Sequence, residues 1–253
     1  MDCAKYRQDW LAEERAAFAG WDFSRLRGRW LEEPEPWDYR SIVLDHLRPA
    51  QQLLDMGTGG GEFLLTLGHP YERTAVTEAW PPNIRLCRER LAPLGIQVAA
   101  VADDGRLPLP DQAFDVVINR HEFYDPGEVA RVLKPGGLFI TQQVGGGNCL
   151  DLAARLNPDG RPLHTAFALA SELPRFHAGG FVIILADECR KTLQFFDVGA
   201  VVYFAKIIEW TFPGFSVDRN FAQLCALQSE RDQEGAIRTI EHRFILMAQK
   251  EQA

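Results

Sequence analysis

Hydrophobic and polar positions follow two different periods through the middle of the chain. Short apolar runs predict strands at residues 51–56, 73–78, 96–102, 113–120 and 138–144. Helical spacing of apolar side chains predicts helices at residues 39–47, 61–68, 81–95 and 126–137. Because strands and helices take turns along the sequence, this region is typical of a parallel sheet whose two faces are covered by helices.

The C-terminal part of the chain follows a different order. Helices are predicted at residues 164–180, 198–210 and 221–239, and strands at residues 181–196 and 241–250. Three consecutive glycines, Gly145–Gly147, favour a hinge between the two halves. Since no long polar linker separates the halves, the sequence predicts a single domain over residues 1–253.

Composition and charge narrow the class of protein. Of the 253 residues, 46% are hydrophobic and 25% are charged, as in an ordinary globular domain. The net charge of -8 argues against nucleic acid as a partner, because binding of phosphates needs clustered Lys and Arg. No apolar run has the length of a membrane span or the form of a signal peptide, and the five cysteines are scattered. We therefore expect a cytoplasmic protein with reduced thiols and no membrane contact.

A glycine-rich loop follows the first strand of the alternating region, with the sequence "DMGTGGG" at residues 55–61. Loops in this place meet ligands at the carboxyl edge of a parallel sheet. A P-loop is excluded because it requires a Lys that is missing here. A dinucleotide fingerprint is disfavoured because Glu62 replaces its third glycine and would repel a pyrophosphate. From the loop alone, a tight turn without a ligand stays open.

Four segments in sequence order resemble the class I, Rossmann-like S-adenosylmethionine-dependent methyltransferases. The first is the D-x-G-x-G-x-G loop, and the second is the strand end at Glu78, about 20 residues further on. The third is "VAADDGRLPLPDQAFDVVI" and the fourth is "EVARVLKPGGLFIT". Together they cover roughly residues 40–145. The resemblance is closest to the ubiquinone/menaquinone-methyltransferase-like branch.

The resemblance implies a three-layer α/β sandwich. Its sheet would have seven mostly parallel strands in the order 3-2-1-4-5-7-6, with the last strand antiparallel. Residues 1–37 would form an N-terminal helical cap, residues 38–145 the cofactor-binding half, and residues 146–253 a substrate-facing half. An insertion between the last two strands, residues 197–237, would form a lid.

The same resemblance implies S-adenosylmethionine as the cofactor and S-adenosylhomocysteine as the product. The residues assigned to the cofactor are Asp55, Gly57, Thr58, Gly59, Gly61, Glu78, Ala79, Asp103, Asp104 and Asn119. Glu78 would bind the ribose hydroxyls, and Asp103 would bind the adenine amino group. The cofactor carries a sulfonium and an ammonium group but no phosphate, so nearby carboxylates favour it. Trp37 and Tyr39 would lie near its methionine end.

The end of the fourth strand supplies the candidates for catalysis. Methyl transfer from a sulfonium needs an aligned nucleophile, and a base where the acceptor carries a proton. His121 is the candidate base, with packing beside the cofactor as the alternative, and Glu122 and Tyr124 are candidates for substrate binding. The Asn/Asp-Pro-Pro-Tyr/Phe motif of many DNA and protein N-methyltransferases is missing from this position. No spacing of His and Cys predicts a metal site.

These observations predict an S-adenosylmethionine-dependent methyltransferase that acts on a small-molecule substrate by direct in-line transfer. One alternative is a methyltransferase acting on RNA or protein, which label transfer to RNA would favour. A second is a non-catalytic cofactor-binding protein, which binding without turnover would favour. An NAD-dependent dehydrogenase is more distant because of Glu62.

Overall fold

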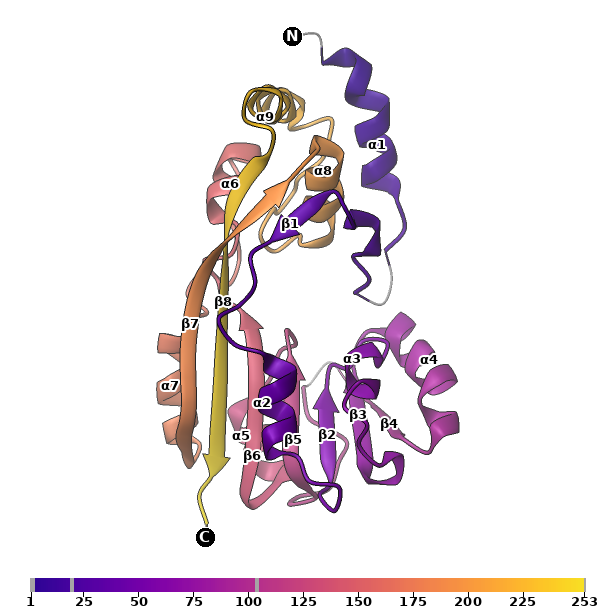
Figure 1. Ribbon diagram of the computed structural model, residues 1–253, viewed down its shortest axis with the longest axis vertical. Coiled ribbons are helices and arrows are strands. Elements are labelled where there is room, and N and C mark those ends of the chain that lie inside the picture. The colour runs from indigo at the N-terminus through magenta and orange to yellow at the C-terminus, as the bar shows by residue number, and fades with distance from the viewer. Residues whose placement is uncertain (1–2, 19–20, 103–104, 253) are drawn as a thin grey trace.

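The computed structural model describes residues 3–18, 21–102 and 105–252 (Figure 1). Its strands are β1 (Trp30–Glu32), β2 (Leu53–Met56), β3 (Thr74–Glu78), β4 (Gln97–Ala100), β5 (Phe114–Arg120), β6 (Leu133–Val144), β7 (Phe181–Phe195) and β8 (Ile237–Lys250). Its α-helices are α1 (Arg7–Arg15), α2 (Tyr39–His46), α3 (Glu62–Leu65), α4 (Pro81–Arg90), α5 (Pro126–Val132), α6 (Leu150–Leu156), α7 (Leu169–Ala178), α8 (Val198–Ile207) and α9 (Phe221–Glu234). Short 3-10 helices lie at Ala4–Tyr6, Ser24–Leu26, Tyr71–Arg73 and Ala92–Leu94. Within these described ranges, none of the helices has the length and apolar character needed to cross a membrane.

The strands form one sheet in the order β1-β7-β8-β6-β5-β2-β3-β4. Neighbouring strands from β6 to β4 are parallel, whereas β8 is antiparallel to both β6 and β7. The mostly parallel α/β sheet is therefore confirmed. The predicted count of seven strands is wrong, because β1 pairs antiparallel with β7 and makes an eighth strand in the described chain.

The additional strand lies in the N-terminal segment that we predicted to be helical. β7 and β8 continue together past the last pair of β6 and β8, Val144 opposite Arg243. The far end of β7 would consequently expose unpaired backbone groups at the edge of the sheet. β1 covers them, with Trp30 opposite Phe195, and a short strand of this kind protects an edge from pairing with other chains. The strand order differs from the predicted one at this edge.

Glycines move several of the predicted boundaries. α5 ends at Val132 rather than at residue 137, because residues 133–137 already belong to β6 and Gly136 has a φ of +76°. α9 ends at Glu234, where Gly235 takes a left-handed conformation with a φ of +82°. A glycine in this conformation commonly ends a helix, and β8 therefore starts earlier than predicted, at Ile237.

Helices cover both faces of the parallel half, which gives the predicted three layers (Figure 1). On one face, α2 and α4 bury side chains such as Val43 and Cys87 against the strands. On the other face, α5 and α7 bury side chains such as Val129 and Phe176. Full burial of a Val or Phe side chain contributes about 1.5–3 kcal/mol, so the two apolar faces hold the sheet between its helices.

A third core lies in the upper half of Figure 1, beyond the carboxyl ends of the parallel strands. It contains side chains of α1, α6, α8 and α9 and of the ends of β7 and β8. We call the unit formed by α1, β1, α6, α8 and α9 the cap. It includes the connections from α1 to β1 and from α8 to α9. The N-terminal segment and the proposed lid, residues 197–237, thus pack around a common core.

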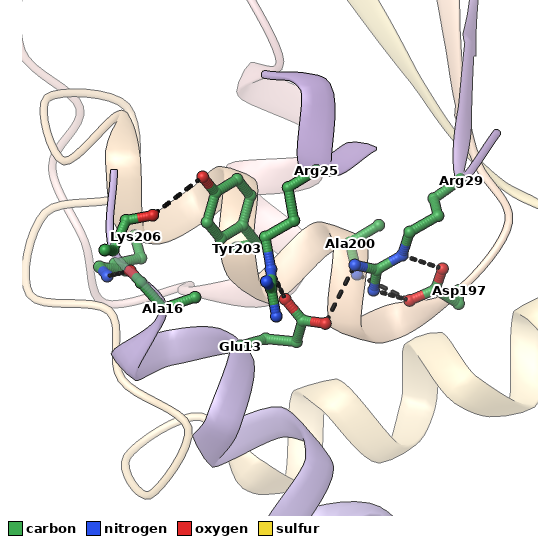
Figure 2. A network of polar contacts seen from close by, with 9 residues as sticks. Glu13, Ala16, Arg25, Arg29, Asp197, Ala200, Tyr203 and Lys206 are labelled. Atoms are coloured by element: carbon green, nitrogen blue, oxygen red, sulfur yellow. Dashed lines mark hydrogen bonds and ion pairs between the residues drawn. The ribbon is translucent and has the colours of Figure 1, made fainter. Parts of the chain in front are cut away.

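Polar contacts fasten α1 to α8 within the cap (Figure 2). The Arg29 guanidinium donates hydrogen bonds to both carboxylate oxygens of Asp197, at 2.9 and 2.6 Å, and to Glu13 at 3.0 Å. Asp197 is also the N-cap of α8, since its side chain accepts a hydrogen bond from an amide of the first turn. Near the other end of α8, Lys206 donates to the carbonyl of Ala16. The N-terminal helix is therefore held at both ends of α8.

Candidate active site

The strand order reverses between β2 and β5, because β3 and β4 follow β2 on one side and β6 follows β5 on the other. Ligands of open α/β sheets bind at such a point, outside the carboxyl ends of the strands. The glycine loop, which we define as residues 57–61, begins directly after β2 and lies at this point. The cap lies beyond the same edge of the sheet (Figure 1).

The glycine loop has a backbone conformation that few other residues can adopt. Gly57, Gly59 and Gly61 have φ values of +68°, +64° and +80°. A Cβ on Gly57 would lie 2.3 Å from Cγ of Glu122, and a Cβ on Gly61 would lie 2.7 Å from a methyl carbon of Leu91. The loop backbone thus carries no Cβ atoms at these positions, and neighbouring side chains pack directly against it. A backbone without side chains also allows a ligand to contact it directly.

Asp55 lies at the base of the glycine loop. Its buried carboxylate accepts a hydrogen bond of 2.6 Å from Oγ1 of Thr58. Burial raises the pKa of Asp55 to about 7, although the hydrogen bond from Thr58 opposes this shift. A positive group beside the carboxylate would favour its ionised form. The base of the loop therefore suits a cationic ligand group.

Glu78 joins the glycine loop to the turn that follows β3. One carboxylate oxygen accepts hydrogen bonds from the Gly59 amide at 2.9 Å and from Nδ2 of Asn83 at 3.3 Å. The other oxygen accepts from the amides of Ala79 and Trp80, at 3.0 and 3.2 Å. Glu78 is almost fully buried. It therefore fixes the shape of the loop, a role that the sequence did not indicate.

Asp103 and Asp104, which we assigned to the adenine end of the cofactor, lie outside the described residues. Residues close to them in the sequence form an open hollow of about 400 Å³ at the carboxyl end of β4. It is lined by Ala100, Ala102, Arg106, Leu107, Pro108 and Leu109. Since β4 is separated from β2 only by β3, the hollow and the glycine loop lie along the same edge of the sheet.

Asn119 is fully buried near the end of β5. Its Oδ1 accepts hydrogen bonds from Oγ1 of Thr141 at 3.1 Å and from Nε2 of Gln143 at 2.6 Å. These two donors fix the orientation of the amide, whose Nδ2 has no partner among the residues that the structure describes. We assigned no role to Thr141 and Gln143, although polar residues within the otherwise apolar strand "LFITQQV" are a signal for a buried polar neighbour.

His121 directly follows β5 and has an uncommon backbone conformation. Its φ is +66°, and its amide donates a hydrogen bond of 2.9 Å to the Gln142 carbonyl. The side chain is exposed to solvent. Desolvation and the positive charges of Arg243, Arg120 and Lys191 hold the pKa of His121 well below its ordinary value. The imidazole is therefore neutral near pH 7 and able to accept a proton.

The two residues predicted to bind substrate lie in different places. The Glu122 side chain lies against Gly57 of the glycine loop, and burial raises its pKa. Tyr124 is only 3% exposed and packs with its ring centroid 5.2 Å from that of Phe139 and 5.7 Å from that of Phe176. Because its ring is part of the core between the sheet and α7, we remove Tyr124 from the candidate site.

Trp37 and Tyr39 join the start of α2 to the central strands. Nε1 of Trp37 donates a hydrogen bond of 2.8 Å to Oε1 of Gln142. The Tyr39 hydroxyl lies 3.0 Å from the carbonyl oxygens of both Asn119 and Ile140. Both residues thus support the ends of β5 and β6, and their contact with the methionine end of a cofactor stays a prediction.

Arg120, the last residue of β5, lies beside the glycine loop, and we had assigned it no role. Its Cζ is 4.5 Å from the ring centroid of Phe63. Phe63 belongs to α3, which starts directly after the loop. Its place at the end of the fourth predicted strand already puts Arg120 near the reacting groups, but the sequence gives no signal for its contact with Phe63.

Comparison with known proteins identifies the central part of the chain. Residues 54–141 match a family described as "Methyltransferase domain". Demethylmenaquinone methyltransferase of Thermus thermophilus is 32% identical over 114 residues, which are 41% of this chain and 52% of that protein. Malonyl-[acyl-carrier protein] O-methyltransferase of Geobacter sulfurreducens is 32% identical over 122 residues, 45% of each protein. The chain spans about half the length of these curated relatives.

Solved structures are similar over a greater length. The YcgJ protein of Bacillus subtilis has a TM-score of 0.55 at 19% identity, over 85% of this chain and 99% of that one. The [4+2]-cyclase SpnF has a TM-score of 0.52 at 18% identity, over 99% of this chain and 95% of that one. At such identities the similarity establishes the fold, and the cyclase illustrates that one fold hosts different reactions.

The fold and the glycine loop define an α/β protein with a candidate ligand site at the switch point of its sheet. Within it, residues 54–141 match the methyltransferase-domain family, and this part of the chain is similar to ubiquinone/menaquinone methyltransferases. The predicted resemblance to these methyltransferases is confirmed over the matched residues.

Proposed function

We propose that the whole chain is an S-adenosylmethionine-dependent methyltransferase that acts on a small-molecule acceptor. The observation that carries the proposal is the glycine loop, in which three left-handed glycines are bordered by the carboxylates of Asp55, Glu78 and Glu122. Carboxylates repel a pyrophosphate but attract the sulfonium and ammonium groups of a phosphate-free cofactor. The family match over residues 54–141 supports the same cofactor.

The site has a suitable group for each part of this cofactor. Asp55 and the glycine loop would hold the methionine end, and Glu78 the ribose hydroxyls. The hollow at the end of β4 would hold the adenine ring, with Asp103 near it in the sequence. The buried, unpartnered Nδ2 of Asn119 would donate a hydrogen bond to a ligand atom at the end of β5. When bound, the cofactor supplies a methyl group already activated on a sulfonium.

His121 would act as the base that takes the proton of the acceptor. Its neutral ring at pH 7 can accept a proton, and its side chain is accessible from solvent at the carboxyl edge of the sheet. A positioned base contributes about 10²–10⁴-fold to such a proton transfer. Arg243, Arg120 and Lys191, which keep the ring neutral, would also favour an acceptor that becomes negative as it loses its proton.

The small-molecule class of the acceptor rests on two observations. The names of two curated relatives specify demethylmenaquinone and a malonyl group on a carrier protein. The net charge of -8 opposes RNA as an alternative acceptor. The cap and the glycine loop lie at the same edge of the sheet (Figure 1). The cap would therefore exclude water from the reacting groups.

Two measurements, made one after the other, test the proposal. Titration calorimetry with S-adenosylmethionine and S-adenosylhomocysteine should give saturable binding to one site per chain. Incubation with methyl-labelled cofactor and separated small-molecule, RNA and protein fractions should then place the label in the small-molecule fraction. The proposal is wrong if neither ligand binds, and the acceptor class is wrong if only RNA or protein is labelled. Binding without label in any fraction would favour a non-methylating function such as that of the cyclase.

A further inference from the structure

The charges around the glycine loop are mostly negative. Asp55, Glu62, Glu78 and Glu122 all lie within or directly beside it. The methionine end of the proposed cofactor is a zwitterion, with an α-ammonium and an α-carboxylate on one carbon. Negative charge around the loop attracts the ammonium and repels the carboxylate. A cofactor in this site therefore needs a cation for its carboxylate.

Two arginines lie close enough to the loop to be considered. Arg90 already forms an ion pair with Glu62. Arg120 forms no ion pair with any carboxylate in the described parts of the chain, and its guanidinium lies over the ring of Phe63. Arg120 is also close enough to Asp55 to lower the pKa of that carboxyl against the effect of burial. A guanidinium stacked on a ring keeps N–H groups at its edge for a carboxylate.

Glu122 contacts the first residue of the same loop. Its Cγ and Cβ lie 2.3 and 2.4 Å from the position of a Cβ on Gly57, whereas Phe63, under Arg120, lies two residues after the last loop residue, Gly61. Glu122 forms no ion pair with any Lys, Arg or His of residues 3–18, 21–102 and 105–252. Between the two charged residues, His121 has a φ of +66°, which departs from the extended conformation of β5. A cation and an anion two residues apart thus both lie beside the loop, Glu122 at Gly57 and Arg120 over Phe63 of the helix that follows.

We infer that Arg120 and Glu122 clamp the zwitterionic methionine end of the cofactor, with Arg120 binding the α-carboxylate and Glu122 the α-ammonium. The inference rests on the proposed function. It assigns Glu122 to binding of the cofactor instead of the substrate. It also gives a role to Arg120, which forms no ion pair with a carboxylate in the described parts of the chain. Both are binding residues and take no part in proton transfer.

The clamp is tested by measuring how three variants, Arg120→Gln, Glu122→Gln and Arg120→Lys, bind three ligands. The ligands are S-adenosylhomocysteine, its analogue without the α-carboxylate and its analogue without the α-amino group, and binding is measured by calorimetry. Arg120→Gln should weaken the binding of S-adenosylhomocysteine about 10- to 100-fold, because one charge-assisted hydrogen-bonded pair is lost. It should not change the binding of the decarboxylated analogue. Glu122→Gln should weaken S-adenosylhomocysteine similarly, with no effect on the deaminated analogue. Arg120→Lys should retain part of the affinity.

Arg88→Gln, which removes one positive charge from α4, is the matched control and should bind all three ligands like the unchanged chain. Circular dichroism should give each variant the unchanged spectrum. Equal weakening of all three ligands by Arg120→Gln, or no weakening, would overturn the clamp. An unchanged cofactor affinity with a raised KM for the acceptor would place Arg120 on the acceptor instead. If the unchanged chain binds none of the ligands, the proposed function itself fails, which is a separate outcome.

Discussion

Four residues around the site share the left-handed backbone conformation: Gly57, Gly59, Gly61 and His121. The glycines take it without a steric penalty, whereas His121 does so against strain of order 1–3 kcal/mol. A hydrogen bond from the His121 amide to the Gln142 carbonyl helps to hold that conformation. At this scale, the backbone decides where side chains can stand: Glu122 fits against the loop only because Gly57 has no Cβ.

Gly57→Ala tests this argument. The new Cβ would lie 2.3 Å from Cγ of Glu122 and would also need the left-handed conformation. We expect the substitution to weaken S-adenosylhomocysteine at least tenfold, measured by calorimetry, and to cost about 1–3 kcal/mol of unfolding free energy.

Gly68→Ala provides the matched control, because Gly68 has a similar φ of +63° but nothing within 4 Å of its Cβ position. It should lose stability through backbone strain alone and keep its affinity for the ligand. Equal affinities of the two variants would contradict the proposed contact between the glycine loop and the cofactor.

His121→Asn tests the base. Asn tolerates the left-handed conformation, so the backbone should persist while the imidazole is lost. With an identified acceptor, we expect kcat/KM to fall by roughly 10²–10⁴-fold. In the unchanged enzyme, kcat/KM should rise with pH through a pKa below the usual histidine value of 6.5 and be level at pH 7–8, because the base works when unprotonated and its pKa is lowered. A pH–rate profile that keeps this rise in His121→Asn would show that another group is titrating.

At the scale of secondary-structure elements, α1 and α8 depend on the part-buried Arg29 more than on exposed ion pairs. Arg29 engages Asp197 with two hydrogen bonds and Glu13 with a third. By contrast, the side chains of the pair formed by Arg7 of α1 with Asp218 are 49% and 64% exposed. Paired hydrogen bonds to a partly buried guanidinium are stronger than an exposed contact, which solvent screens.

Arg29→Ala should therefore destabilise the chain by about 1–2 kcal/mol and Arg7→Ala by less than about 0.5 kcal/mol. Denaturant titration gives both free energies, and hydrogen exchange should locate the faster opening in α1 for the Arg29 variant. Similar values for the two variants would mean that the network of Figure 2 contributes no more than an exposed pair.

The elements that the sequence predicts correctly are those whose signals are local. The strand before the glycine loop and the helices between the parallel strands each follow from the apolar period or from turn residues nearby. β1 depends on pairing between Trp30 and Phe195, and the cap core on contacts between the two ends of the chain. Arg120 is expected near the reaction from its place at a strand end, but its contact with Phe63 depends on the fold. None of these long-range contacts can be recognised from a short stretch of the sequence.

At the scale of the whole molecule, β7 and β8 connect the cap to the parallel half of the sheet (Figure 1). A charged cluster lies where they leave β6, just past the pair Val144 and Arg243. Glu241 is 1% exposed and forms ion pairs with Lys191, at 3.0 Å, and with Arg243. Because these strands run without interruption through both cores, we expect the cap and the parallel half to unfold together.

Glu241→Gln should lower the free energy of unfolding by about 3–5 kcal/mol, because it leaves the buried Arg243 without its carboxylate and leaves Lys191 paired with Glu35 alone. Glu234→Gln is the matched control: its pair with Arg238 is exposed, so its effect should stay below about 1 kcal/mol. Unfolding in urea would be followed by tryptophan fluorescence, to which Trp10 and Trp30 of the cap contribute, and by far-ultraviolet circular dichroism for the whole chain. In Glu241→Gln the two midpoints should move together. If the fluorescence midpoint fell alone, the cap would be a separate folding unit, and the continuous strands would not couple it to the site.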